Sequence, residues 1–297
     1  MTAQKDAVGV IGLGLIGTTL AKRLLAAGFK VHGYDVRAER IQQLAALGGT
    51  ACGSPRTVAQ ACDTTVLAVF NTDQVESVLE ASDGAQFTTG QIVICTSTCD
   101  PDRIEALAKR VEARGVRFLE SPISGNSDQI AKGNGIALIG GDRDIMHTAM
   151  PVLKALCKQS HYLGPVGSGG RAKLAVNLIG GLNRAVMAEG LAFAEAMGLE
   201  LAPFLEVLKS SAAYSRAMDT RGMKMITSDF TPHAWLMQSL KDFKLMHEVS
   251  GRVGQQLPLA KLYTELVESC IAHGEGDLDN SAVIQELRRR RAKHIAS

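Results

Sequence analysis

A glycine-rich turn between an expected strand and an expected helix most constrains the fold of this 297-residue chain. The apolar run AVGVI, residues 7–11, leads into GLGLIG, in which Gly12, Gly14 and Gly17 have the spacing G-x-G-x-x-G. An amphipathic stretch follows, and the next apolar run, KVHGYD, ends at Asp35, 18 residues after Gly17. A strand, a glycine turn, a helix and an acid in this order are typical of a dinucleotide-binding βαβ unit.

The glycine turn and the helix behind it form an expected anion site. Gly12 allows a tight turn, Gly14 lets a pyrophosphate approach the backbone, and Gly17 lets the helix pack against the sheet. The N–H groups at the start of the helix and the helix dipole attract phosphate. We therefore expect a dinucleotide to be bound by the backbone of Gly12, Leu13, Gly14, Leu15, Ile16 and Gly17.

The acid at the end of the second strand indicates which dinucleotide is bound. A carboxylate at Asp35 can accept hydrogen bonds from the adenosine ribose hydroxyls and repels a 2′-phosphate, which favours NAD. Arg37 lies two residues further along and could pair with a 2′-phosphate, or it could be a solvated arginine at the start of a helix. We expect NAD as the preferred cofactor, with NADP as the alternative.

The pattern of apolar residues changes once along the chain. Up to about residue 163, short runs rich in Val and Ile alternate with amphipathic stretches, which predicts a parallel sheet with helices on both faces. From residue 164 on the pattern is helical throughout, beginning with a long helix over 168–197 and ending with one over 280–293. The sequence thus predicts an α/β fold with a Rossmann-type dinucleotide-binding domain at 1–163 and an all-helical domain at 164–297.

Composition excludes several classes of protein. The net charge is +2, which gives no electrostatic case for nucleic acid or a membrane surface as partner. The six cysteines form no C-x-x-C pair, and the seven histidines show no metal-binding spacing, so we expect no metal. No apolar stretch approaches the length of a membrane span, and the first residues do not resemble a signal peptide. We expect a cytoplasmic protein with reduced thiols.

The long helix carries an ammonium group where apolar residues dominate. In GSGGRAKLAVNLIGG, Lys173 and Asn177 lie one turn apart among Leu, Val and Ile residues, and therefore share one face of the helix. The carbonyl oxygen gains negative charge when a hydride is added to its carbon, so a reductase needs a proton donor within hydrogen-bond reach. Lys173 could be this donor, or a lysine whose stem is buried and whose head reaches water. Asn177 could orient a substrate or be a hydrogen-bonded core residue.

Several further segments resemble one enzyme family, in order along nearly the whole chain. They are VGVIGLGLIGTTLAKRLL, TSTCDP, SPISGNSDQIAKG, GGRAKLAVNLI, SLKDFKLM and DNSAVIQEL. These segments resemble the conserved blocks of the β-hydroxyacid dehydrogenases, which include 3-hydroxyisobutyrate dehydrogenase and 2-hydroxy-3-oxopropionate reductase. Any one block could arise by chance, whereas their shared order is specific for the family and says little about the substrate.

The resemblance implies a role for each matching residue. Lys173 matches the family's general acid and base, and Asn177 matches the amide that holds the reacting substrate. Thr98 matches a residue beside the nicotinamide. Lys241 matches a lysine that reaches the cofactor from the helical domain, with Asp242 as its usual companion.

A loop in SPISGNS is the expected substrate carboxylate site. Ser124 and Gly125 match the family's carboxylate-binding loop, and successive backbone N–H groups in such a loop attract an anion independently of the resemblance. The sequence departs from the family's D-A-P-V-S-G-G pattern here, because Asn126 replaces the second glycine and Glu120-Ser121 replace Asp-Ala. Asn126 could bond an extra polar group of the substrate, or fill space and exclude larger acids.

The segment after the strand TTVLAVF is a further expected cofactor contact. Phe70 stands where the family commonly has proline, and Asn71 follows it on the cofactor side of the sheet. Asn71 could contact the ribose or the nicotinamide, or cap the end of the strand.

Together these residues predict an NAD(P)-dependent oxidoreductase. Its substrate would be a small 3-hydroxy carboxylate or the corresponding semialdehyde, of the 3-hydroxyisobutyrate or tartronate semialdehyde type. Alternatives are a sulfonate-semialdehyde reductase or imine reductase of the same fold, and a non-catalytic dinucleotide-binding protein that would not need Lys173 and Asn177 together. The resemblance also implies a homodimer or homotetramer formed through residues 168–297.

Overall fold

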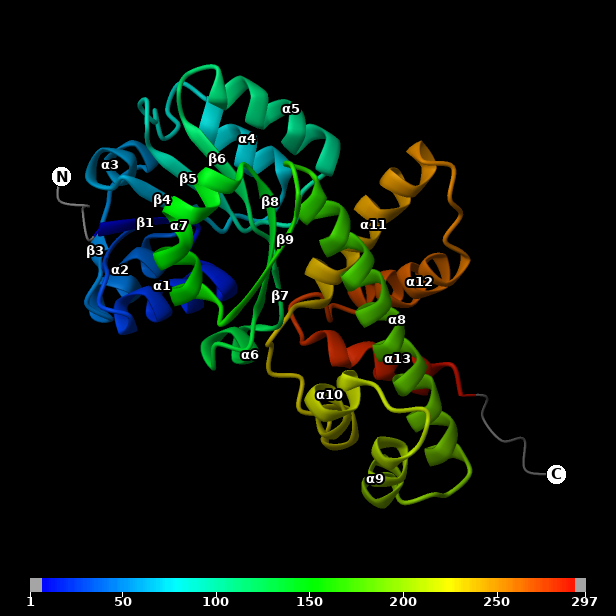
Figure 1. Cartoon of the computed structure of the whole chain (residues 1–297). Coiled ribbons are helices and arrows are strands. Elements are labelled where there is room, and N and C mark those ends of the chain that lie inside the picture. The colour runs from blue at the N-terminus through cyan, green and yellow to red at the C-terminus, as the bar shows by residue number, and fades with distance from the viewer. Residues whose placement is uncertain (1–6, 292–297) are drawn as a thin grey trace. The chain divides into compact units, whose positions relative to one another are not determined.

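The computed structural model describes residues 7–291 of the chain (Figure 1). These residues fall into two compact units, one up to Leu174 and one from Ala175 on, so the division lies inside the long helix α8 (Ser168–Ala196). The domain ranges that the sequence suggests, 1–163 and 164–297, place the division before this helix begins. Those ranges stay a prediction.

The first unit alternates strands and helices. In chain order its elements are β1 (Ala7–Ile11), α1 (Leu15–Ala26), β2 (Lys30–Tyr34), α2 (Ala38–Ala46), β3 (Thr50–Ala51), α3 (Pro55–Ala61), β4 (Thr64–Leu67), α4 (Thr72–Glu80), β5 (Ile92–Cys95), α5 (Pro101–Glu112), β6 (Arg117–Glu120), β7 (Ile123–Ser124), α6 (Ser127–Ala131), β8 (Ile136–Gly141), α7 (Arg143–Leu156) and β9 (Gln159–Gly164).

The strands form one sheet with the order β3-β2-β1-β4-β5-β6-β8-β7, and β9 pairs with β8. The pairs from β3 to β6 are parallel, as predicted. The prediction of a wholly parallel sheet is wrong at β8, which is antiparallel to both β6 and β7. The stretch between β7 and β8 holds only the short α6, and a parallel return needs a crossover of about a dozen residues or more.

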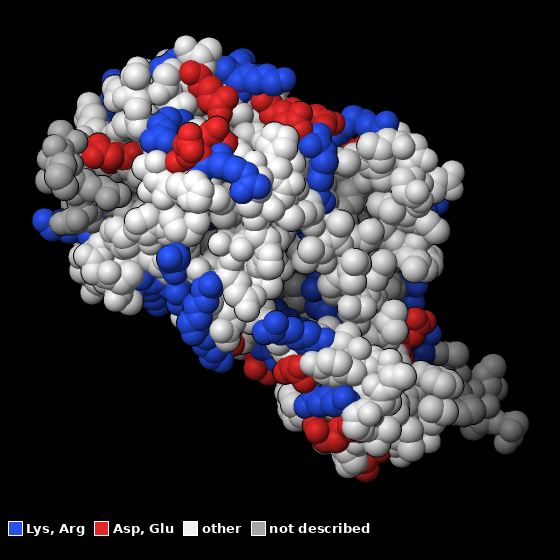
Figure 2. All heavy atoms as spheres, viewed as in Figure 1, with Lys and Arg blue, Asp and Glu red and all other residues white. Residues whose placement is uncertain are grey.

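Helices cover both faces of the sheet (Figure 1), and an apolar core lies between the sheet and each layer of helices. One combines buried residues of the sheet with α1, α2, α6 and α7, and the other combines them with α3, α4 and α5. On the outer side of α4 and α5, Figure 2 shows acidic and basic side chains interspersed. They include the ion pairs of Arg103 with Asp73 and Glu76, and of Arg110 with Glu80. Such exposed pairs contribute less than about 1 kcal/mol each.

Local sequence signals set several element ends. Helix α5 begins at Pro101, with the Asp100 carboxylate accepting a bond from the Asp102 N–H, and it ends at Glu112, shortly before Gly115. Helix α8 ends at Ala196, two residues before Gly198, whose φ of +82° is suited to glycine. The sequence suggests Ser168 as the residue that caps α8, but this prediction is wrong by one position, because Ser168 already lies inside the first turn.

The second unit is helical in its described part. After α8 come α9 (Leu201–Ser210), α10 (Arg216–Thr227), α11 (Leu236–Arg252), α12 (Pro258–Ala272), the short 3-10 helix η1 (Asn280–Ala282) and α13 (Val283–Arg289). The predicted helix over 280–293 is confirmed up to residue 289, and its residues 292–293 lie outside the described part.

Two buried contacts organise the second unit. The Phe243 and Tyr263 rings lie 4.5 Å apart between α11 and α12, and a Cβ at Gly181 of α8 would lie 2.5 Å from Phe243. The Arg221 guanidinium pairs with the Asp279 carboxylate at 3.0 Å, and both side chains are buried. Glycine at 181 therefore lets α8 pack directly on the Phe243 ring.

Candidate functional site

The expected cofactor residues of the first unit gather at one edge of the sheet. Ile11, Leu67, Cys95 and Glu120 stand side by side in register at the ends of β1, β4, β5 and β6. The loops that follow these strands therefore begin along one line. The strand order reverses between β1 and β4, and ligands of such sheets bind at the carboxyl ends of the strands beside this reversal.

The glycine turn has the backbone that the sequence predicts. Gly12 has a φ of +92°, and a Cβ there would lie 2.6 Å from the Ala68 carbonyl oxygen. A Cβ at Gly17 would collide with the Gly12 carbonyl oxygen. At Gly14, in contrast, a Cβ would meet only an Arg40 nitrogen, at 3.6 Å, and no side chain caps α1. The space beside Gly14 and the N–H groups of Leu15 and Ile16 thus suit a pyrophosphate.

Asp35 lies against this turn. Its buried carboxylate accepts a bond from the Leu13 N–H at 2.7 Å and from the Arg37 N–H at 2.9 Å, and it lies 3.3 Å from Arg40. The structure therefore places Asp35 beside the glycine turn, as predicted, and Arg40 lies next to it. Sequence reasoning overlooked Arg40, although its place in the first turn of α2, five residues after Asp35, could have indicated it.

The other residues expected at the cofactor edge contribute in different ways. The side chain of Arg37 is exposed. Asn71 caps the start of α4, its side-chain oxygen accepting a bond from the Gln74 N–H at 3.0 Å, whereas the sequence suggested a cap at the end of the preceding strand. The Phe70 N–H donates to the Gln74 side chain at 2.8 Å, which fixes the backbone of this turn.

Thr98 lies in a buried loop after β5. The side chains of Thr96 and Ser97 donate to the carbonyl oxygens of Leu67 and Val69, which ties this loop to the loop after β4. Thr98 itself is buried. The loop is therefore held at the cofactor edge independently of any ligand.

The two cysteines that flank Thr98 are buried and free. The neighbouring Cys99 thiol, followed by burial, raises the pKa of Cys95 well above its ordinary value. A protonated thiol is a poor nucleophile, so this pair does not suit covalent catalysis.

The expected substrate loop begins at the end of β7. Ser124 is half-buried, and Gly125 has a φ of +142°, a conformation that glycine favours. The Asn126 side-chain oxygen accepts a bond from the Gln129 N–H at 2.8 Å, while the Gln129 side chain accepts one from the Asn126 N–H at 3.0 Å. Asn126 thus caps α6, a role that was not predicted, and its amide orientation is fixed by this cap.

Lys173 lies at the other side of the same loop. Only 7% of its surface is exposed, and its ammonium donates to the Ile123 carbonyl oxygen at 2.6 Å. Ile123 directly precedes Ser124. The structure therefore brings the buried ammonium of α8 to the predicted carboxylate loop, within the first unit.

The second unit holds its own polar cluster. The Asn177 side-chain nitrogen donates to the Asp242 carboxylate at 2.8 Å, and the Lys241 ammonium lies 2.8 Å from the same carboxylate. Asp242 is buried. Asn177, Lys241 and Asp242 are thus brought together by α8 and α11.

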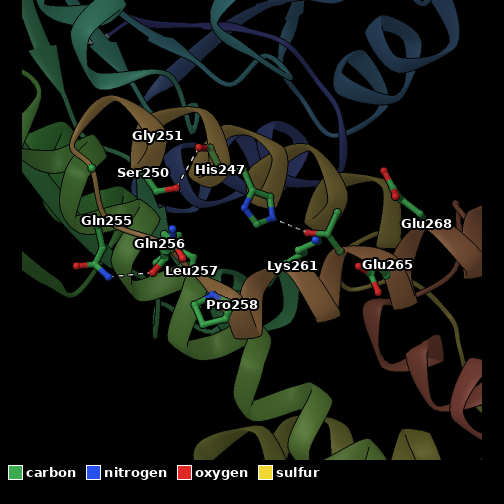
Figure 3. A pocket seen from close by; sticks show the side chains of 12 residues that line it. His247, Ser250, Gly251, Gln255, Gln256, Leu257, Pro258, Lys261, Glu265 and Glu268 are labelled. Atoms are coloured by element: carbon green, nitrogen blue, oxygen red, sulfur yellow. Dashed lines mark hydrogen bonds between the residues drawn. The ribbon is translucent and has the colours of Figure 1, made fainter.

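The second unit also has a separate open hollow of about 830 Å³ between the end of α11 and the start of α12 (Figure 3). His247 bonds Thr264 across it at 3.0 Å, and Lys261, Glu265 and Glu268 lie along α12. None of the predicted site residues lines this hollow.

Residues 7–291 contain neither a metal-binding cluster nor a membrane-spanning helix. No group of three or more His, Cys, Asp or Glu side chains in this part of the chain could hold a metal ion. No helix formed by these residues is both long and apolar enough to cross a membrane.

Comparison with known proteins agrees with the geometry along the chain. Residues 7–164 match the model of the NAD-binding domain of 6-phosphogluconate dehydrogenase, and residues 167–287 match that of the NAD-binding domain of NADP-dependent 3-hydroxyisobutyrate dehydrogenase. The chain belongs to the β-hydroxyacid dehydrogenase family. The family resemblance read from the sequence and the predicted fold class are thereby confirmed.

Relatives in this family span different substrates. The chain is 31% identical to the L-threonate dehydrogenase of Cupriavidus necator, over 94% of this chain and 95% of that protein. It is 30% identical to glyoxylate/succinic semialdehyde reductase 1 of Arabidopsis thaliana, over 95% and 98%. The crystal structure of 3-hydroxyisobutyrate dehydrogenase from Salmonella typhimurium has a TM-score of 0.86 at 28% identity, covering 94% of this chain and 99% of that one.

The β-hydroxyacid dehydrogenase assignment makes the chain an oxidoreductase that uses a nicotinamide dinucleotide. The first unit fits this cofactor, since the space beside Gly14 and the uncapped start of α1 can hold the pyrophosphate and the Asp35 carboxylate can accept bonds from ribose hydroxyls. The sequence-based prediction of an enzyme is confirmed at this level.

Proposed function

We propose that the chain interconverts a small 3-hydroxy carboxylate and its semialdehyde, of the 3-hydroxyisobutyrate or tartronate semialdehyde type. The observation that carries the proposal is the buried Lys173 ammonium, held 2.6 Å from the Ile123 carbonyl oxygen at the start of the anion loop. A buried ammonium is costly unless it has a partner or a function. Here the Ile123 carbonyl is one such partner, and it holds the ammonium at the loop proposed to bind the substrate carboxylate.

Lys173 is the proposed general acid and base. When bound, the nicotinamide supplies or accepts the hydride. Lys173 donates a proton to the carbonyl oxygen during reduction and accepts one from the hydroxyl during oxidation, and the Ile123 carbonyl holds its nitrogen in place meanwhile.

Asn177 is the proposed orienting amide. Its side-chain nitrogen donates to Asp242, so its oxygen is the end that remains to accept a bond. We infer that this oxygen accepts from the substrate hydroxyl. Asp242, which also pairs with Lys241, fixes the amide in that orientation.

The loop of Ser124, Gly125 and Asn126 is the proposed carboxylate site. Because the Asn126 oxygen caps α6, its side-chain nitrogen is the group that can donate to a ligand. We propose that this nitrogen bonds a further hydroxyl of the substrate. The similarity to L-threonate dehydrogenase supports a substrate with more than one hydroxyl group.

The test is a panel of small acids measured with NAD and NADP by absorbance at the wavelength of the reduced nicotinamide. The panel contains 3-hydroxyisobutyrate, tartronate semialdehyde and threonate, together with sulfonate semialdehydes and a cyclic imine. We expect the highest kcat/KM with a hydroxy carboxylate that carries a second hydroxyl. Activity only with the imine or the sulfonates, or none at all, would contradict the proposed function.

The Asn126→Gly variant tests the proposed contact of Asn126 with the substrate, because glycine is the family's usual residue there. Loss of one hydrogen bond to the substrate should lower kcat/KM for polyhydroxy acids by about tenfold and leave 3-hydroxyisobutyrate nearly unchanged. A general rise in activity toward larger acids would instead show that Asn126 acts by filling space.

We further propose that α8 packs against a second copy of the chain. Ile179, Val186 and Phe193, here called the α8 stripe, are 62%, 69% and 65% exposed and recur every seven residues. Residues seven apart lie on one face of a helix, and a self-complementary apolar face suits a two-fold interface. The assembly would be a homodimer or a homotetramer.

The Val186→Glu variant should therefore reduce the mass in solution to that of one chain, measured by light scattering after size-exclusion chromatography. Burying an unpaired carboxylate at the interface disfavours association. Val253→Glu is the control, because Val253 is 71% exposed outside the α8 stripe. A monomeric wild-type protein, or an unchanged mass of Val186→Glu, would contradict the proposal.

A further inference from the structure

Glu120 is a buried carboxylate beneath the start of the helix that carries Lys173. It is the last residue of β6, and only 2% of its surface is exposed. Its carboxylate accepts a bond from the Gly167 N–H at 2.8 Å, and further bonds from the Gly169 and Gly170 N–H groups. The first N–H groups of a helix have no partner within the helix, so Glu120 supplies their acceptor.

The surrounding glycines make room for this carboxylate. A Cβ at Gly170 would lie 2.6 Å from one Glu120 oxygen, and a Cβ at Gly140 would lie 2.8 Å from the other. A Cβ at Gly169 would lie 2.5 Å from the Leu138 carbonyl oxygen. The start of α8 is therefore packed directly onto β6 and β8, with Glu120 between them.

The same short segment holds Lys173 itself. Glu120 binds the first turn of α8, and Ile123, three residues later, accepts the bond from the Lys173 ammonium. Residues 120–123 thus fix both the backbone of the first turn and the head of the lysine one turn further along. A shift of this turn would move the ammonium relative to the loop of Ser124.

The charged neighbours do not neutralise Glu120. Arg171 is the cation that acts on it, but this side chain is exposed and pairs with Asp102 and Glu105 of α5, which lies beside the start of α8 in Figure 1. Cys95 of β5 is the residue paired with Glu120 in the sheet, and its thiol has a pKa raised well above the ordinary value, so it carries no charge that could neutralise Glu120. Burial raises the pKa of Glu120 to about 7, although the three N–H groups and Arg171 act in the opposite direction.

We propose that Glu120 is a positioning residue that fixes the first turn of α8, and with it the place of Lys173 for proton transfer. The proposal rests on the proposed role of Lys173 as general acid and base. The ionised carboxylate is the form that accepts all three N–H bonds, so ionisation of Glu120 should hold the turn and its protonation should loosen it.

Ionisation of Glu120 should lower the stability of the folded protein and raise its activity. Because its pKa is about 7 in the folded protein and 4.5 ordinarily, the folded state binds a proton between these values that the unfolded chain does not. This contribution to stability is complete below pH 4.5 and is lost as the pH rises through 7. A neutral isostere should therefore gain stability relative to the wild type as the pH rises, while it loses the carboxylate that positions Lys173.

The experiment compares wild type, Glu120→Gln, Glu120→Asp and Asp142→Asn. Asp142 caps α7 in the same manner, accepting the Asp144 and Ile145 N–H groups, and serves as matched control. We expect Glu120→Gln to lower kcat by about 100-fold, which is typical of a small misplacement of a catalytic group, with little change in KM. Glu120→Asp, which keeps a carboxylate, should retain more of kcat, and Asp142→Asn nearly all of it.

Two further measurements separate positioning from a general loss of structure. Protection of the amides at 167–173 against hydrogen exchange, after correction for the intrinsic rate at each pH, should fall in Glu120→Gln and, in wild type, on lowering the pH through 7. The fall of kcat below pH 7 that Glu120 causes should be missing in Glu120→Gln. The difference in Tm between Glu120→Gln and wild type should become more positive from pH 5 to pH 8.

The outcomes are distinct. Unchanged exchange at 167–173 in Glu120→Gln overturns the proposal, whether or not a substrate is known. Turnover lost together with Tm at every pH also overturns it, because that is the signature of a merely structural residue. If wild type turns over no member of the acid panel, the proposed function fails, while the exchange measurement still decides whether Glu120 fixes the turn.

Discussion

Replacement of Lys173 by alanine should lower kcat by about 10²–10⁴-fold in both directions, while the protein still binds NADH. The physical reason is the position of this group: a buried ammonium, bonded to one backbone carbonyl, at the loop expected to hold the substrate carboxylate. Steady-state kinetics with the best acid of the panel measure the first effect, and quenching of protein or nicotinamide fluorescence measures the second.

A second substitution distinguishes proton transfer from electrostatic attraction. Arginine keeps the positive charge of Lys173 but does not lose its proton in proteins. If Lys173 exchanges a proton with the substrate, Lys173→Arg should be about as impaired as Lys173→Ala. Recovery of most activity by arginine would mean that the charge alone matters.

The control is Lys154→Ala, which removes an exposed ammonium from α7 in the same unit. Its kcat should remain within a factor of about two of wild type, since exposed substitutions away from a site have small effects. Unchanged turnover of Lys173→Ala would contradict the proposed role of Lys173, and loss of NADH binding in that variant would show that the residue serves the cofactor cradle.

Local sequence patterns predicted the cofactor half of the first unit well. The glycine spacing, the strand ends and Asp35 are all written within about 30 consecutive residues, and each follows from the geometry of one βαβ unit. The family resemblance then supplied the order of the remaining blocks. The helical second half was also predictable, because its apolar residues recur with the helical period.

Contacts between distant segments were not predictable in this way. Glu120 binds Gly167 across 47 residues, and Lys173 binds Ile123 across 50. The direction of β8 depends on its pairing with β6 and β7, which no pattern within β8 records. The sequence marked Glu120 only as a departure from the family pattern, and its place beneath α8 became clear from the packing of Gly140 and Gly170.

Some signals were present and were overlooked. Asn126 is followed three residues later by Gln129, the spacing of a capping box, and the structure uses it to begin α6. Ser54 and Thr57 show the same relation at the start of α3. The cap and the proposed substrate contact of Asn126 are compatible, because the side-chain oxygen caps α6 and the side-chain nitrogen can donate to the substrate.

Cofactor preference should depend on Asp35. We propose that the wild-type protein prefers NAD, because an ionised carboxylate in the cradle repels a 2′-phosphate. Asp35→Asn removes this charge but keeps an oxygen that can accept the Leu13 N–H bond. The ratio of kcat/KM for NADP to that for NAD should rise by about 100-fold, or about 2.7 kcal/mol, within the range of like-charge repulsion between close groups.

Arg40 should contribute to the same change. In wild type its guanidinium lies 3.3 Å from the Asp35 carboxylate, and neutralising that carboxylate leaves the cation beside the space at Gly14. Adding Arg40→Ala to Asp35→Asn should therefore abolish most of the gained use of NADP. Adding Arg37→Ala should do so only if the exposed Arg37, rather than Arg40, binds the 2′-phosphate.

Glu39→Gln is the matched control for charge, because it removes one carboxylate from the same first turn of α2 at an exposed position. It should leave the cofactor ratio nearly unchanged, since exposed charges act weakly through water. A wild-type protein that already prefers NADP would contradict the proposed preference. An Asp35→Asn variant with an unchanged ratio would mean that discrimination lies elsewhere. We therefore expect removal of the Asp35 charge to leave Arg40 able to bind the 2′-phosphate of NADP. Comparing Asp35→Asn with the double variant that also carries Arg40→Ala measures this contribution of Arg40.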